Sequence, residues 1–139
     1  MSKITAKTTR TITPVVYSDF FTDFSRSSST GQLNKKTNEN AVKQSIRNLL
    51  LTDFYERPFH PEIGSNLRGL LFENITPGVI PRAKKAIEEV FDLYEPRAAL
   101  IRTDIIPTPD SLGLVVTIYF RIINTEGTES LDIILERTR

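Results

Sequence analysis

The spacing of apolar residues changes at Pro96, and this change constrains the fold more than any other feature of the sequence. Before Pro96, apolar side chains recur every three or four residues, at Ile80, Ala83, Ile87, Val90, Phe91 and Tyr94. This spacing predicts an amphipathic helix. We expect the helix to end at Glu95, because a proline disfavours helical geometry in the residue before it. From Ala98 the spacing becomes two, which is typical of strands with one buried face.

Three segments after Ala98 have this strand pattern. Their apolar faces are formed by Ile101, Thr103 and Ile105 in the first, by Val116, Ile118, Phe120 and Ile122 in the second, and by Leu131, Ile133 and Leu135 in the third. Turns are expected at Pro107–Gly113 and at Asn124–Gly127. The pattern predicts a small antiparallel three-stranded C-terminal sheet with helices packed on its apolar face, so the fold class is α+β.

Two further helices are expected before this point, which gives three in all. The segment Ala41–Leu51 carries an apolar stripe, and either Asn38 or Asn40 can cap its start. A short helix is expected over Ser65–Glu73, with Ser65 as its cap and its leucines on one face. The third helix starts near Pro77 or Pro81, since proline is tolerated in a first turn.

The N-terminal region has a different composition. Residues 1–14 are rich in threonine and contain few large apolar groups, so we expect an extended N-terminal arm. Residues 15–139 are expected to form a single domain, because the length and apolar content suit one core. Val15–Tyr17 is strand-like, and residues 32–36 suit a short edge strand.

Composition argues against several function classes. There are 18 basic and 17 acidic residues, so no basic surface for nucleic acid is expected. The chain has no cysteine, which removes disulfides and thiolate metal sites. No window approaches the roughly eighteen apolar residues of a membrane span. We therefore expect neither nucleic acid nor a membrane among the partners.

Enzymatic chemistry would have to use carboxylates. Asp53, Glu56, Glu62 and Glu73 lie near one another in the sequence, and two of them at the right separation could act as the acid and base of a glycoside hydrolase. Acidic residues in loops and at helix ends are usually solvated or capping, so we expect no catalytic residue. His60 is the only histidine and has no second ligand of its kind, so no metal site is expected. No phosphate-binding or dinucleotide fingerprint is present, and no cofactor is expected.

The stretch Glu56–Glu73 begins as a proline-stiffened loop and resembles a known family. The matching residues are Arg57-Pro58-Phe59, Pro61-Glu62, Gly64, Leu67, Leu71-Phe72-Glu73-Asn74 and Thr76-Pro77, followed by Tyr94-Glu95-Pro96-Arg97. These motifs resemble the baseplate wedge family of contractile-tail phages, the sheath-initiator proteins, whose relatives lie in type VI secretion baseplates. The likeness extends from about Tyr17 to about Leu135. Relatives often have a glycine shortly before Arg-Pro-Phe, where this chain has Tyr55 and Glu56.

The resemblance implies that Glu95-Pro96-Arg97 docks on a helical bundle of two larger wedge proteins. The alternative is an internal ion pair between Arg97 and Glu95, and we favour the partner role. Arg57 also adjoins a proline in a rigid segment. Its guanidinium group could bind either a partner or, as an internal ion pair, Glu56.

The last strand, Glu129–Arg137, is the second candidate for partner binding. At a sheet edge it could accept a strand from another chain, with Leu131, Ile133 and Leu135 setting the register. Its charges could instead protect the edge. In the family, the β-rich end resembles the part of a sheath subunit that receives neighbouring strands, so the resemblance favours strand exchange that starts the first sheath ring.

The resemblance therefore implies a non-enzymatic structural component of a phage tail baseplate, located in the virion and assembled in the host cytoplasm. Its expected partners are other baseplate wedge proteins and the tail sheath protein, with tail tube or hub-proximal proteins as further candidates. One alternative is a type VI secretion baseplate component. The alternative of another class is a tail-associated, lysozyme-like cell-wall hydrolase.

Overall fold

The computed structural model describes residues 14–73, 76–108, 113–123, 125 and 127–136. Its elements, in chain order, are β1 (Ser18–Phe20), β2 (Lys35–Thr37), α1 (Glu39–Leu51), α2 (Leu67–Leu71), α3 (Val79–Tyr94), β3 (Ala98–Pro107), β4 (Gly113–Ile122) and β5 (Glu129–Glu136). The expected α+β class, the three helices and the C-terminal sheet are confirmed. The N-terminal arm expected over residues 1–14 lies, except for Pro14, outside the described residues.

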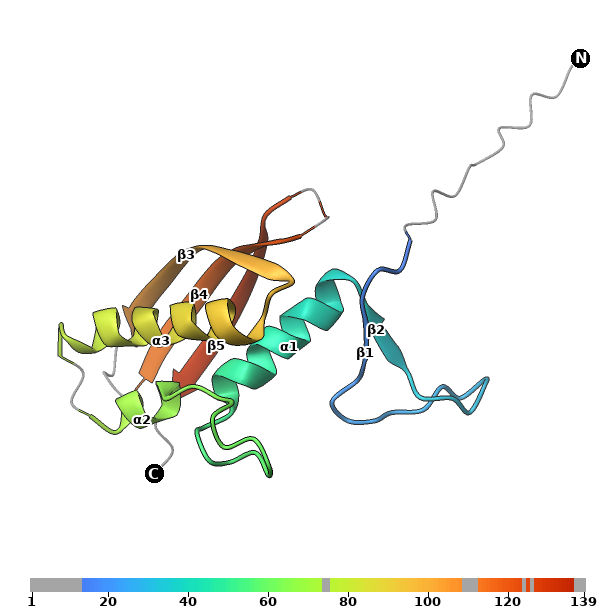
Figure 1. Cartoon of the computed structure of the whole chain (residues 1–139), viewed down its shortest axis with the longest axis horizontal. Coiled ribbons are helices and arrows are strands. Elements are labelled where there is room, and N and C mark those ends of the chain that lie inside the picture. Colours follow the sequence, from blue (N-terminus) through green and yellow to red (C-terminus); the bar gives the residue numbers. More distant parts are fainter. Residues whose placement is uncertain (1–13, 74–75, 109–112, 124, 126, 137–139) are drawn as a thin grey trace, which may run out of the picture.

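The C-terminal sheet is antiparallel and has the strand order β3-β4-β5. The helices α1 and α3 lie against one face of it (Figure 1). The central strand β4 supplies the middle of the core, where Val116, Ile118, Phe120 and Ile122 are buried as predicted. The ring of Phe91 from α3 lies 5.9 Å from that of Phe120, measured between centroids. Helix and sheet therefore share one apolar core.

The alternation in β3 differs from the prediction at Ile101. The register shifts between the pairs Leu100–Phe120 and Arg102–Tyr119, so Ile101 is the extra residue of a β-bulge. Ile101 is 55% exposed, whereas Thr103 is buried. A bulge inserts one residue into one strand and thereby shifts the alternation of faces. The prediction that Ile101 shares the buried face with Thr103 was wrong for this reason.

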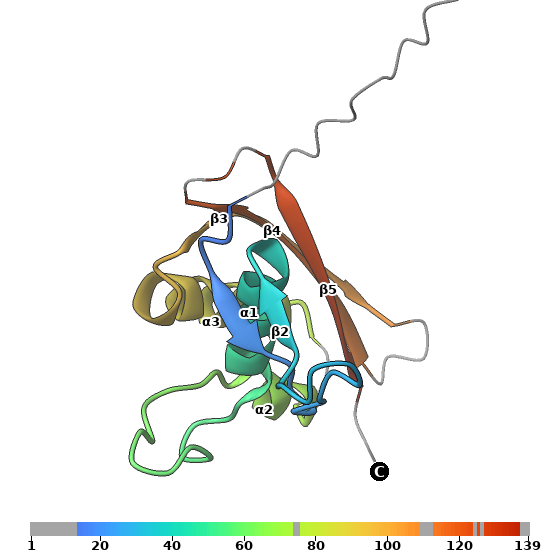
Figure 2. The same ribbon diagram turned by 90° about the vertical axis from the view of Figure 1, so that its right-hand side faces the viewer.

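A second sheet joins β1 to β2. It lies apart from the main sheet, beyond the start of α1, in Figure 1, and it is seen in front of α1 in Figure 2. Asn38 fixes this ribbon to the body. It precedes α1 but does not cap it through its side chain. Instead its Oδ1 oxygen accepts hydrogen bonds from the backbone amides of Val16 (2.9 Å) and Tyr17 (3.4 Å). The expected capping role was wrong because this side chain serves the N-terminal segment instead.

The helix α2 is shorter than the expected Ser65–Glu73, but its leucines are buried as predicted. The hydroxyl of Ser65 donates to the carbonyl of Leu50 (2.7 Å) and accepts a long bond from the amide of Leu67 (3.4 Å). At Gly64, φ is +154°, and a Cβ atom would lie 2.7 Å from the carbonyl oxygen of Thr52. The exit of the loop is therefore held tightly against the end of α1.

Candidate functional site

The first candidate site is the junction where α3 ends and β3 begins. Glu95 is completely buried, and both of its carboxylate oxygens accept hydrogen bonds from Arg97, at 2.6 Å from Nε and 2.8 Å from Nη2. Pro96 lies between the two residues and stiffens the turn that brings them together. The hydrogen bond to Glu95 is the main cause that raises the pKa of Arg97 above its ordinary value. The pair is therefore bidentate, charged and rigid.

Tyr17 covers the other side of this arginine. The guanidinium carbon of Arg97 lies 5.7 Å from the centroid of the Tyr17 ring, within the range of a cation–π contact. The Tyr17 hydroxyl donates to the carbonyl of Ile123 (3.4 Å), and the amide of Ile123 donates to the carbonyl of Arg97 (2.8 Å). The N-terminal segment and the end of β4 thus meet at the junction.

These contacts bear on the alternatives drawn from the sequence. The internal Glu95–Arg97 ion pair is present, so Arg97 could meet a partner only with the part of its side chain that stays exposed, which is 34%. The side chain of Glu95 is 0% exposed. Glu95 could therefore act in docking only through Arg97, which it holds in place.

Arg57 lies in the loop between α1 and α2, and its environment differs. It is exposed and forms no salt bridge with the residues that the structure describes. The expected alternative pair with Glu56 is not formed, because a carboxylate oxygen of Glu56 accepts from the amide of Asp53 (2.9 Å). The hydroxyl of Tyr94, at the end of α3, donates to the carbonyl of Glu62 (2.7 Å). The loop is thereby attached next to the junction.

The loop also presents aromatic side chains. Phe59 is 97% exposed and Tyr55 is 85% exposed, and both have φ values near +65°, at 65° and 67°. Residues other than glycine rarely adopt this conformation, and it costs of the order of 1 kcal/mol. A backbone bond from the amide of Tyr55 to the carbonyl of Pro61 (2.9 Å) closes the loop on itself. The loop is a shaped element, as its prolines predicted.

The second candidate site is the last strand. The order β3-β4-β5 makes β5 an edge strand. Ile133 and Leu135 are buried and Leu131 is partly buried against the same core. These three side chains therefore pack into the core of this chain. They could influence the register of an incoming strand only by fixing the position of β5.

Helix α1 covers the first half of the β5 edge. The ammonium of Lys43 lies 2.6 Å from a carboxylate oxygen of Glu129. Further along, Nη2 of Arg47 donates to the backbone carbonyl of Asp132 (3.2 Å). Lys43 and Arg47 lie outside the apolar stripe expected for Ala41–Leu51, so the sequence pattern did not indicate that they reach a strand.

The contact with Arg47 also shows which backbone groups of β5 point away from β4. In an antiparallel strand, the N–H and C=O groups of one residue point to the same side, and the sides alternate along the strand. Since the carbonyl of Asp132 points outward, those of Ile134 and Glu136 do so too. Gly113, the β4 partner of Glu136, agrees with this, because its amide and carbonyl bond with Thr108 on the β3 side. The open part of the edge is therefore Ile134–Glu136.

Two of the four carboxylates considered for catalysis, Glu62 and Glu73, have local side-chain partners. Glu62 lies 3.2 Å from Nδ1 of His60, and its pKa is lowered chiefly by a backbone hydrogen bond and then by His60. Glu73 accepts from Nη2 of Arg82 (2.9 Å), and this bond lowers its pKa. A glycosidase general acid needs a raised pKa. Neither residue has the property that this role requires.

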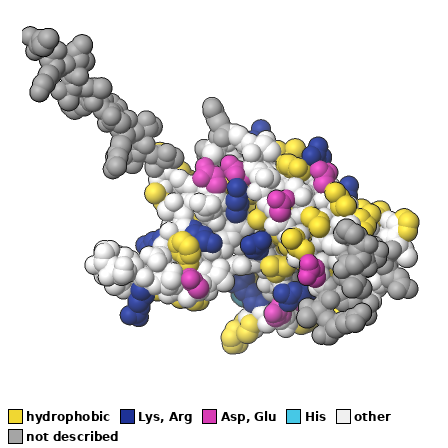
Figure 3. All heavy atoms as spheres, turned by 180° about the vertical axis from the view of Figure 1, so that it is seen from behind, with side chains coloured by type: hydrophobic (Ala, Val, Ile, Leu, Met, Phe, Trp, Pro, Cys, Tyr) yellow, Lys and Arg dark blue, Asp and Glu magenta, His cyan; other side chains and the backbone are white. Residues whose placement is uncertain are grey.

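Further features of the described residues concern metal ions, membranes and the character of the surface. No group of three or more histidine and acidic side chains among them is arranged to hold a metal ion. None of their helices is long and apolar enough to cross a membrane. Figure 3 shows hydrophobic side chains interspersed with single charges of both signs on the face turned away from the view of Figure 1. Apolar and charged side chains are therefore mixed on this face, as on most protein surfaces.

The chain was compared with protein families and with a curated relative. The family model described as baseplate wedge protein gp25 matches residues 36–126. The baseplate wedge protein gp25 of Enterobacteria phage T4 is 36% identical over 84 residues, which make up 60% of this chain and 64% of that protein. The chain thus spans just under two thirds of the length of this relative.

Three solved structures have a similar fold. A candidate tail lysozyme from Geobacter sulfurreducens has a TM-score of 0.64 and 23% identity, covering 70% of this chain and 89% of that chain. A chain of the anti-feeding prophage baseplate has a TM-score of 0.62 and 23% identity, covering 86% and 85%. A chain of the postcontracted pyocin R2 baseplate has a TM-score of 0.52 and 18% identity, covering 82% and 98%. At these identities the likeness shows the fold alone.

The family assignment rests on the extent of the match. Residues 36–126 make up well over half of the chain, and they include the loop that carries Arg57 and the Glu95–Arg97 junction. The chain belongs to the baseplate wedge protein gp25 family.

Proposed function

We propose that this chain is a structural component of a contractile-tail baseplate, located in the virion. The observation that carries the proposal is the family match over residues 36–126. The buried core, which runs from Val42 in α1 to Leu135 in β5, supports treating residues 15–139 as one structural domain. The tail lysozyme likeness concerns the fold, and the lowered pKa values of Glu62 and Glu73 give a hydrolase no support. The proposed role is therefore mechanical.

The junction is the proposed docking point for other wedge proteins. The guanidinium of Arg97 is already fixed by Glu95 and Tyr17, so little side-chain entropy is lost when its exposed part meets a partner. Helix-end carbonyls or carboxylates of a helical bundle are suitable acceptors for it. Arg57 and the exposed aromatic side chains of the neighbouring loop extend the same surface.

The β5 edge is the proposed starting point for the sheath. A strand from a sheath subunit would add to the open backbone groups of Ile134 and Glu136, because α1 covers the edge before them. Leu131, Ile133 and Leu135 would hold β5 in place from the core side. Strand addition at this edge is thus expected to be short.

Co-purification with the wedge and sheath proteins of the same source tests the docking proposal. The test variant is Arg97→Lys, which keeps the charge and loses the fork, and the matched control is Arg121→Ala on the exposed face of β4. Both are first shown to be folded by circular dichroism. We expect wild type and the control to retain the wedge proteins. Arg97→Lys is expected to bind them at least tenfold more weakly, which corresponds to a loss of roughly 1.4 kcal/mol of binding free energy.

Two outcomes would contradict the proposal. Equal retention by wild type and Arg97→Lys would make the junction an internal brace. Sustained release of sugar fragments from peptidoglycan by the pure protein, lost in Glu62→Gln, would establish the hydrolase alternative. Retention by type VI secretion baseplate proteins instead of phage wedge proteins would support the structural role but assign the chain to a secretion system.

A further inference from the structure

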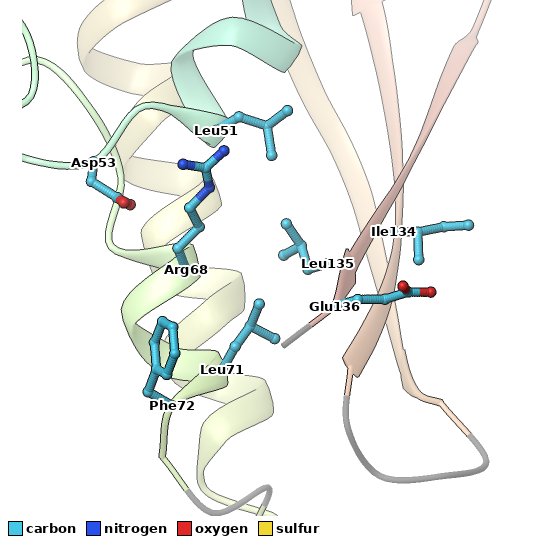
Figure 4. A pocket seen from close by; sticks show the side chains of 8 residues that line it. All are labelled: Leu51, Asp53, Arg68, Leu71, Phe72, Ile134, Leu135 and Glu136. Atoms are coloured by element: carbon cyan, nitrogen blue, oxygen red, sulfur yellow. The ribbon is translucent and has the colours of Figure 1, made fainter. Parts of the chain in front are cut away.

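A groove of about 620 Å³ lies between α2 and the end of β5 (Figure 4). One wall comes from the end of α1, the loop after it and α2, and the other from β5. The lining residues are Leu51, Asp53, Arg68, Leu71, Phe72, Ile134, Leu135 and Glu136. Five of these eight side chains are apolar, and the other three are charged.

The β5 wall consists of three consecutive residues, and this shows which part of the strand borders the groove. Side chains of neighbouring strand residues point to opposite faces, and Figure 4 shows Ile134 and Leu135 doing so. A groove that touches both faces must run along the edge of the strand. The edge at this position carries the outward N–H and C=O groups of Ile134 and Glu136. Such groups are matched best by the backbone of an extended peptide.

The opposite wall carries a polar atom without a partner. Oδ1 of Asp53 is buried and has no hydrogen-bond partner among the described residues. A buried acceptor of this kind costs free energy until a donor reaches it. Arg68, which also lines the groove, forms no salt bridge with the described residues. The lining contains two acidic side chains, Asp53 and Glu136, and one basic side chain, Arg68. This balance favours a cationic group on a molecule that binds in the groove.

We propose that this groove selects the segment that adds to β5: a short extended stretch of a partner protein that pairs with Ile134 and Glu136 and carries a lysine or arginine directed at Asp53. The inference rests on the strand addition proposed above and adds the chemistry that the segment must have. The apolar side chains next to this basic residue would fill the space between Leu71 and Leu135.

The first test uses the folded full chain and a displayed library of short random peptides. Ile134→Pro removes only an outward N–H, so it blocks strand addition without breaking a bond to β4, and Ile134→Thr is the matched control that keeps this N–H. We expect wild type and Ile134→Thr to enrich peptides with one basic residue among alternating apolar ones. Ile134→Pro, shown to be folded, is expected to enrich none of them.

The second test concerns the basic residue. For the best enriched peptide, replacing its lysine or arginine by methionine is expected to weaken binding to wild type about tenfold, as for a lost charge-assisted hydrogen bond. The same replacement in the peptide is expected not to change its binding to the Asp53→Asn variant. The control variant is Asp92→Asn, an exposed site on α3 away from the groove, which should behave as wild type.

Several outcomes would overturn the proposal. These are enrichment without a basic residue, enrichment that survives Ile134→Pro, and the absence of any enrichment. A concentration-dependent wild-type dimer that Ile134→Pro abolishes would assign the edge to a second copy of this chain. Retention of the sheath protein by wild type but not by Ile134→Pro, together with peptides lacking a basic residue, would leave the strand addition standing and reject only the selection by Asp53.

Discussion

At the junction that ends α3, both carboxylate oxygens of Glu95 receive hydrogen bonds, whereas in the groove beside β5 the buried Oδ1 oxygen of Asp53 receives none. Both places are candidates for partner binding, and they differ in what a partner could add. The junction is satisfied internally, so a partner can use only the exposed remainder of Arg97. In the described part of the groove, Oδ1 of Asp53 lacks a donor and β5 has no neighbouring strand on its outer edge, so a partner can supply both. Neutralising the carboxylate should therefore change stability in opposite directions: Glu95→Gln at the junction should lower it, and Asp53→Asn in the groove should raise it.

The largest expected effect tests whether β5 is core on one face and open on the other. Leu135→Ala should lower the free energy of unfolding by about 2–5 kcal/mol, since it leaves a cavity in the buried cluster. Ile134→Ala, at a side chain that is 63% exposed, should change it by no more than about 0.5 kcal/mol. Urea unfolding measures both. An equal loss of unfolding free energy in the two variants would contradict the assignment of Leu135 to the buried face and Ile134 to the exposed face.

The junction should be strongly and asymmetrically sensitive. Arg97→Ala leaves the buried Glu95 carboxylate without a partner and should cost about 3 kcal/mol. Glu95→Gln leaves an arginine that is one third exposed and can be hydrated, so about 1–2 kcal/mol is expected. The double variant should cost less than the sum of the two. If Glu95→Gln costs more than Arg97→Ala, the unpaired buried carboxylate is not the main source of this sensitivity.

In the groove the sign should reverse. Asp53→Asn keeps the shape and removes a charge whose Oδ1 oxygen is buried without a partner, so unfolding should require about 0.5–1 kcal/mol more free energy. Denaturation midpoints at constant slope provide the measurement. Asp92→Asn, on the exposed face of α3, serves as the neutral control. A loss of stability in Asp53→Asn beyond that of the control would remove the contrast between the two regions.

The smallest effect concerns an exposed ion pair. The pKa of Glu73 is lowered from 4.5 by its hydrogen bond with Arg82, so the folded state holds the ionised form better than the unfolded state does. The resulting stability is present above pH 4.5 and is lost as the pH falls through the lower folded pKa. The stability difference between wild type and Glu73→Gln should therefore shrink below that pH. The exposed Glu88→Gln on α3 is the control, and a difference that does not depend on pH would contradict the pairing.

The main architecture was predictable because it rests on periodicity. The spacing of apolar residues in α3 and in β4 identified both elements and their buried faces, and Pro96 located the end of the helix. The bulge at Ile101 was not predictable, because one extra residue leaves a strand pattern that still alternates in the sequence. The pairing of β1 with β2 is also weakly encoded, since each strand has three residues.

The candidate sites were predictable only as positions. The sequence located Arg97 beside a proline and β5 at the end of a meander, but it did not show that Glu95 is buried or that Tyr17 covers the arginine. Arg47 has the spacing of a solvent-facing helix residue, and only the packing of α1 against the sheet brings it to Asp132. Long-range side-chain contacts with backbone groups leave no periodic signal in a sequence.

The cover that α1 lays over the first half of β5 has a further consequence for the free protein. An edge strand that is open along its whole length can recruit identical copies and grow into aggregates. With Lys43 and Arg47 bound to β5, this edge offers identical copies a shorter row of uncovered backbone groups. The cover therefore lowers the tendency of the β5 edge to recruit identical copies and leaves one short position on it uncovered.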